Sequence, residues 1–89
     1  MYYYNLPFKR LLIYVLLEAD PMKVSYDKLW KLLIDNKMKK SDLAKAAQIS
    51  QYTMTNLNND RLVSMEIMLR LCKIFHCDIG DVMEVIEND

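Results

Sequence analysis

Four polar side chains suited to paired hydrogen bonding recur within six residues of the chain. Gln51 and Asn56 carry amides, and Tyr52 and Thr55 carry hydroxyls. An amide presents a donor and an acceptor side by side, which matches the edge of adenine in the major groove of duplex DNA. Tyr52 can also pack on a thymine methyl group, and Thr55 can reach a base or a phosphate. This chemistry is hydrogen-bonded recognition of a partner.

Groups for acid, base or nucleophilic catalysis are scarce. The chain has one histidine, His76, and one glycine, Gly80, and no paired carboxylates converge in its middle. Cys72, His76 and Cys77 invite a zinc interpretation, but zinc usually takes four tetrahedral ligands and the sequence has no second cluster. We therefore predict that the protein is not an enzyme and that it has neither a metal site nor a cofactor.

Basic residues are concentrated around the four polar side chains. The chain has 12 basic and 12 acidic residues, yet residues 22–63 hold eight basic against four acidic ones, and residues 64–89 hold two against six. We expect the side chains that flank them to contact the phosphate backbone of DNA. Such contacts fix the position of the protein on the duplex but do not distinguish one base sequence from another. The flanking side chains are Lys39, Lys40, Ser41, Asn58, Asn59 and Arg61.

Two short helices joined by a tight turn, within residues 40–59, would position these groups. Projected at 100° per residue, the first helix turns Leu43, Ala44 and Ala47 to one side. The second, over about residues 51–58, turns Thr53, Met54 and Leu57 inward and the four polar side chains outward. Its start is indicated by Ser50, whose hydroxyl can accept a first-turn amide, and by Ile49, which can pack on Met54 as a hydrophobic staple.

Three further helices are predicted around this pair. One covers residues 25–36 with Ser25 as its cap, and another opens at Ser64 and runs to about residue 75. A last helix starts at residue 78 with a capping box of Asp78 and Asp81. Its inward residues are expected to be Ile79, Val82, Met83 and Ile86. Trp30 lies in the apolar stripe of the first of these helices, and we assign it to the core rather than to base stacking.

The first 21 residues form an apolar extension ahead of a domain over residues 22–89. Pro7 and Pro21 would bracket a helix of about three turns, but residues 11–17 are equally acceptable as a buried strand. We expect the extension to make a dimer contact; alternatively, synthesis in the cell starts at Met22. The apolar run is too short to cross a membrane and lacks a signal-peptide cleavage site. With only two cysteines, the composition fits a reducing cytoplasm.

The segment LAKAAQISQYTMTNL, residues 43–57, resembles the core of the lambda-repressor-like, or XRE, family of bacterial and phage helix-turn-helix regulators. The resemblance continues through SMEIMLRLCKIFHCDIGDVMEVI and covers roughly residues 23–86. It implies an all-α, compact five-helix domain that binds double-stranded DNA, with Gln51, Tyr52, Thr55 and Asn56 reading bases. Such regulators, commonly repressors, usually bind near-palindromic sites as homodimers.

Two positions depart from the family pattern. Gln48 stands at the turn position where the family usually has glycine. The family also has a glycine in the loop after the recognition helix, which here is the helix over about residues 51–58, and residues 58–60, Asn-Asn-Asp, replace it. Asn and Asp tolerate positive φ better than most residues, so strain is expected mainly at Gln48. These departures and the neutral net charge leave a second function open. The fold would then be a protein-interaction module, as in antitoxins or phage-encoded inhibitors.

Overall fold

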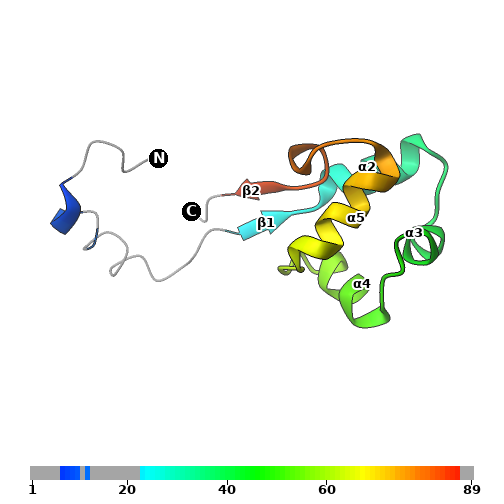
Figure 1. The fold of residues 1–89 in the computed structure, drawn as a ribbon, viewed down its shortest axis with the longest axis horizontal. Helices are drawn as coiled ribbons and strands as arrows, with labels where there is room; N and C mark the ends of the chain where they lie inside the picture. The colour runs from blue at the N-terminus through cyan, green and yellow to red at the C-terminus, as the bar shows by residue number, and fades with distance from the viewer. Residues whose placement is uncertain (1–6, 11, 13–22, 87–89) are drawn as a thin grey trace.

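A computed structural model of the protein describes residues 7–10, 12 and 23–86 (Figure 1). Its elements are β1 (Lys23–Ser25), α2 (Asp27–Asp35), α3 (Lys40–Ala47), α4 (Gln51–Asn58), α5 (Met65–Phe75), the 3-10 helix η1 (Ile79–Asp81) and β2 (Glu84–Ile86). The predicted five-helix, all-α class is confirmed, with η1 as the fifth helix and the two short strands as a minor addition. No helix in the described residues is long and apolar enough to cross a bilayer.

The predictions for the apolar extension concern residues 1–21, most of which lie outside the described residues. Residues 8–10 and residue 12 are helical and exposed. The choice between a helix and a strand over residues 11–17, and the proposed dimer contact, therefore stay predictions. The same holds for a start of synthesis at Met22.

Local side-chain chemistry starts α4 and α5 where the sequence predicts. The Ser50 hydroxyl accepts from the Thr53 amide at 3.2 Å, and the Ser64 hydroxyl accepts from the Ile67 amide, also at 3.2 Å. Each bond satisfies a donor that has no partner inside its own helix. The helix predicted over residues 25–36 begins two residues later, at Asp27, because residues 23–25 form β1.

The helices end in left-handed residues that are not glycine. Among the described residues, Lys37, Gln48 and Asp60 have φ of 54° and His76 has φ of 51°. Gln48 follows α3 and His76 follows α5, where glycine is the usual choice. The glycine of the chain, Gly80, does not have a positive φ. The strain expected at Gln48 is thus present, and other parts of the molecule must hold these turns.

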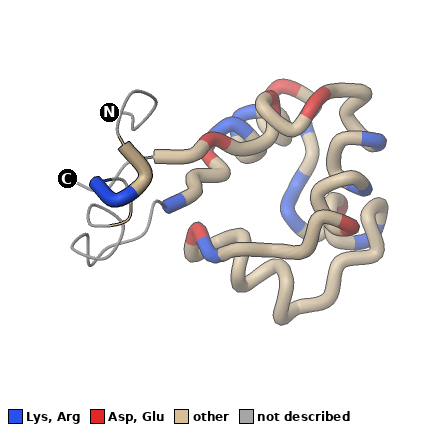
Figure 2. Tube along the Cα trace, turned by 60° about the vertical axis from the view of Figure 1, so that its left-hand side comes forward, with Lys and Arg blue, Asp and Glu red and all other residues tan. Residues whose placement is uncertain are grey.

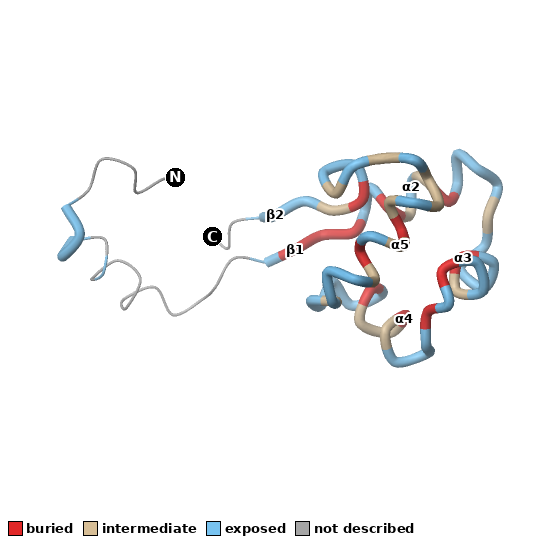
Figure 3. The backbone as a smooth tube through the Cα atoms, viewed as in Figure 1, coloured by how far each residue is buried: buried red, intermediate tan, exposed pale blue. Residues whose placement is uncertain are grey.

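The helices α2, α3, α4 and α5 contribute to one core, and Figure 3 shows their buried stretches facing one another. Each of these helices buries two residues in this core, which are, in chain order, Leu29, Leu33, Leu43, Ala47, Met54, Leu57, Met68 and Leu71. Val82, which is fully buried, closes the core after η1. Trp30 is half-buried against this cluster, in agreement with its assignment to the core.

The last helix is shorter than predicted. The capping box forms, because the Asp78 amide donates to Asp81 Oδ2 at 3.0 Å. The helical turn nevertheless ends at Asp81, and residues 84–86 form β2, which pairs antiparallel with β1 in the register Lys23↔Ile86. The prediction that Ile86 points inward from a helix is therefore wrong, and its side chain is 41% exposed. A second strand at residues 23–25 supplies backbone partners that a local pattern does not reveal.

Candidate nucleic-acid interface

The N-terminal end of α4 presents two of the four predicted base-reading side chains to solvent. Gln51 is exposed, and Tyr52 is 77% exposed although it is aromatic. Met54 and Leu57, on the other side of the same helix, are buried in the core. The amphipathic projection is therefore correct for this part of α4, which offers an amide and a phenol to a partner.

The other two predicted base-reading residues are less accessible. Thr55 and Asn56 are half-buried. The Thr55 hydroxyl donates to the Gln51 carbonyl at 2.9 Å, so its proton already has a partner within the helix. Any contact of Thr55 with a partner would use the lone pairs of its oxygen as acceptors. Of the four predicted base-reading residues, the exposed ones are thus the two in the first turn of α4.

The predicted backbone contacts lie at both flanks of α4, and several have partners within the protein. Lys40 Nζ donates to Asn58 Oδ1 at 2.7 Å, joining the start of α3 to the end of α4. Asn59 Nδ2 donates to the Thr55 carbonyl at 2.9 Å and so caps α4. Lys39 and Ser41 are exposed beside Lys40, and Arg61 is exposed after the loop. The structure thus brings Lys40 and Asn58 into direct contact, a pairing that the sequence did not predict.

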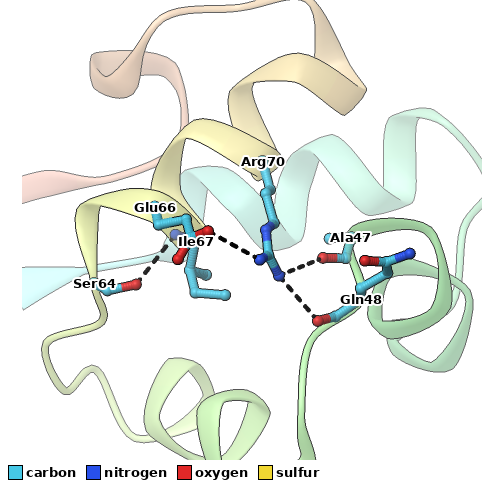
Figure 4. A network of polar contacts seen from close by, with 6 residues as sticks. All are labelled: Ala47, Gln48, Ser64, Glu66, Ile67 and Arg70. Carbon is cyan, nitrogen blue, oxygen red and sulfur yellow. Dashed lines mark hydrogen bonds and ion pairs between the residues drawn. The ribbon is translucent and has the colours of Figure 1, made fainter.

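Arg70 of α5 holds the turn that leads into α4 (Figure 4). Its Nη1 donates to the carbonyls of Ala47 at 3.4 Å and Gln48 at 3.2 Å, and its Nη2 is 3.2 Å from Glu66 Oε1. The carbonyls at the end of α3 have no partner within their helix, so the guanidinium supplies one. Arg70 therefore fixes the turn at the position where the chain lacks glycine.

Tyr26 holds the loop that follows α4. Its side chain is 1% exposed, its hydroxyl donates to the Arg61 carbonyl at 2.8 Å, and its amide donates to Asp60 Oδ1 at 3.1 Å. Burial raises the pKa of the Tyr26 phenol, and the charge of the Asp60 carboxylate raises it further. The phenol is therefore held in its protonated form, in which it donates.

Sequence reasoning missed the positioning roles of Tyr26 and Arg70. Tyr26 is buried just before α2, and Arg70 pairs with Glu66, four residues earlier on the same helix. Their partners, however, lie 22 to 35 residues away along the chain. No local spacing carries that information, although a tyrosine on a buried stripe does indicate that its hydroxyl needs a partner.

Two further features of the described residues are the distribution of charge and the protonation of the cysteine thiols. On the right-hand edge of the tube in Figure 2, most of the charged positions are Lys or Arg. Among the described residues, no group of three or more His, Cys, Asp or Glu side chains could hold a metal ion. Burial raises the pKa of the Cys72 and Cys77 thiols, so both favour the protonated form that binds metals poorly.

Comparison with known proteins gives a consistent result. A family model described as a Cro/C1-type helix-turn-helix DNA-binding domain matches residues 28–88. The structure is similar to a crystal structure of the transcriptional regulator VanUg, with a TM-score of 0.75 and 42% sequence identity. That alignment covers 81% of this chain and 96% of the other. No curated protein sequence matches the chain.

Proposed function

Because this chain belongs to the family of Cro/C1-type helix-turn-helix DNA-binding domains, we propose that it is a sequence-specific repressor of transcription that inserts α4 into the major groove. The family assignment itself makes the protein a DNA-binding transcriptional regulator, a class without a catalytic step. The likeness to VanUg, a transcriptional regulator, supports the regulatory role. The finer role of a bacterial or phage repressor rests on the resemblance of residues 43–57 to the lambda-repressor-like family. We assign its action to the cytoplasm.

The observation that carries this proposal is the orientation of α4. Its buried face fixes the helix through Met54 and Leu57, while Gln51 and Tyr52 extend into solvent from its first turn. An α-helix fits the major groove, where the four base pairs differ in their donors and acceptors. We assign base reading to Gln51 and Tyr52 first, and to the half-buried Thr55 and Asn56 second.

Backbone binding is assigned to the flanking side chains. They can contact phosphates on either side of the groove that α4 enters, and are Lys39, Lys40, Ser41, Asn58, Asn59 and Arg61. With about five such contacts, the logarithm of affinity should fall with the logarithm of salt concentration at a slope of about −4 to −5. A protein-interaction module would instead leave every duplex unbound even at low salt.

A homodimer is proposed as the binding unit. Leu62, Met65 and Leu69 are 77%, 61% and 57% exposed, and Met65 and Leu69 are four residues apart on α5. Apolar side chains exposed in this way support a contact with a second copy. Two copies would place their α4 helices about 34 Å apart, one turn of the duplex.

The experiment that tests the proposal is selection from random duplex followed by sequencing and affinity measurement. We expect an enriched, near-palindromic site with half-sites about one turn apart. Gln51→Ala should weaken the selected site by about 1–3 kcal/mol, roughly 5- to 150-fold, and relax base preference there. Lys40→Ala serves as the contrast and should weaken selected and scrambled duplexes alike.

Each outcome of this experiment decides a separate part of the proposal. Equal losses on both duplexes for Gln51→Ala would remove its assignment as a reader. A single enriched half-site would remove the homodimer. Absence of binding to any duplex at low salt would overturn the proposed repressor and favour the protein-interaction module.

A further inference from the structure

Lys40 is held by two residues from other helices. Its Nζ lies 4.2 Å from the centroid of the Trp30 ring and 2.7 Å from Asn58 Oδ1. Trp30 belongs to α2, Lys40 opens α3 and Asn58 closes α4. The ammonium group of Lys40 therefore contacts α2 and links α3 to α4.

These contacts fix a side chain that is otherwise mobile. A lysine has a flexible stem, and an exposed one samples many rotamers. The face of an indole ring attracts a cation, and tryptophan does so better than other aromatic residues. The second contact, a charge-assisted hydrogen bond, sets the direction of one N–H of the ammonium. The charge of Lys40 is thus placed before any partner arrives.

The same arrangement leaves donors available for an anion. An ammonium has three N–H groups, and one of them is directed at Asn58. Because Asn58 accepts through Oδ1, its Nδ2 is left to donate, and it has no hydrogen-bond partner among the described residues. Lys40 and Asn58 are both exposed. A lysine N–H and an amide N–H can therefore reach the oxygens of one tetrahedral anion.

We propose that Trp30 is a positioning residue for DNA binding, acting through Lys40 to preform a site for one backbone phosphate between Lys40 and Asn58. The inference rests on the proposed function and deepens it, since it gives α2 a part in the interface. Trp30 does not touch the DNA. It fixes where the positive charge is presented, so its effect on binding requires Lys40.

A double-mutant cycle on Trp30 and Lys40 tests this dependence. Trp30→Leu keeps an apolar side chain against the core but removes the aromatic face, Trp30→Phe restores a weaker face, and Lys40→Met removes the charge. Dissociation constants are measured for the selected and a scrambled duplex over a range of salt concentrations. Thermal unfolding of each variant shows that it is folded at the temperature of the binding measurement.

We expect Trp30→Leu to weaken both duplexes equally, about 3- to 10-fold, and Trp30→Phe to recover part of that loss. Lys40→Met should lower the magnitude of the salt slope by about 1. When Lys40 is already Met, Trp30→Leu should cause no further loss of affinity. Lys45→Met, an exposed charge removal on the same helix, is the control, and in that background Trp30→Leu should keep its full effect.

The wild-type protein offers a second measurement, because Trp30 is its only tryptophan. Binding of duplex should change the fluorescence emission of Trp30, and Lys40→Met should abolish that change. If Trp30→Leu weakened duplex binding as much in the Lys40→Met background as in the wild type, the inference would be overturned and Trp30 would have only a structural role in the core. No effect of Trp30→Leu on the wild type would also overturn it. If the wild type binds no duplex, the proposed function itself fails.

Discussion

The two ends of α4 are held in different ways. The turn before it is fixed by Arg70, a charged side chain that is 38% exposed and donates to the carbonyls of Ala47 and Gln48. The loop after it is fixed by Tyr26, a neutral side chain that is 1% exposed and bonds to both Asp60 and Arg61. Each end includes a left-handed residue that is not glycine, Gln48 before the helix and Asp60 after it.

This difference shows how a chain with one glycine can still position a recognition helix. A glycine would lower the conformational cost of each turn, whereas here contacts from Tyr26, just before α2, and from Arg70 of α5 compensate for that cost. The Tyr26 contact should contribute more to stability than the Arg70 contact, because the Tyr26 ring is buried and its hydrogen bonds are part-buried, whereas water competes for the exposed bond from Arg70 to Gln48. The following changes test that ranking in order of decreasing effect.

Tyr26→Ala is expected to have the largest effect. It removes a fully buried aromatic side chain and should lower the free energy of unfolding by about 3–5 kcal/mol. Tyr26→Phe keeps the ring, but it leaves the Arg61 carbonyl without its partner and should cost about 1–3 kcal/mol. Chemical denaturation followed by circular dichroism measures both losses. A neutral Tyr26→Phe would show that the hydroxyl does not hold the loop.

Arg70→Met should have a smaller effect, about 1–2 kcal/mol, because the guanidinium is partly exposed and the Glu66 pair adds little. Glu66→Gln is the control, since it removes the ion pair and leaves the bonds to the turn. It should change the free energy of unfolding by less than about 0.5 kcal/mol. A loss for Glu66→Gln equal to that for Arg70→Met would assign the effect to the ion pair.

These two contacts also show what the sequence could and could not predict. The caps at Ser50 and Ser64 were predictable because the donor and the acceptor lie three residues apart. The bonds of Tyr26 and Arg70, and the contact of Lys40 with Asn58, join residues 18 to 35 positions apart and arise only when the helices pack. The wrong prediction of a helix over residues 84–86 has the same cause, because β2 forms by pairing with β1.

Glycine substitutions distinguish the roles of the two left-handed residues at the ends of α4. Gln48→Gly should stabilise the protein by about 0.5–1 kcal/mol, because it relieves left-handed strain while Arg70 still binds the carbonyls. Asp60→Gly relieves similar strain but removes the acceptor of the Tyr26 amide, so we expect no gain and a net loss of about 1 kcal/mol. Equal gains at both positions would show that Asp60 contributes only its backbone conformation.

The smallest expected effect is a pH dependence confined to the Tyr26 side. Burial and the Asp60 charge raise the pKa of Tyr26 in the folded state, so the folded protein retains this proton above pH ~10, where the unfolded chain loses it. Stability from this group is complete below pH ~10 and falls as pH rises through the folded pKa. Tyr26→Phe should lessen that fall, and an unchanged profile would contradict the assignment.

The pairing of β1 with β2 has a mechanical consequence. Lys23 and Ile86 are cross-strand neighbours at the open end of an antiparallel ribbon, so the chain enters and leaves the domain at adjacent points. A force that pulls these two points apart loads the hydrogen bonds of the ribbon one at a time, so the strands separate in sequence from the open end. The helices that hold α4 lie beyond this ribbon in the load path, so tension would reach them only after the strands have separated.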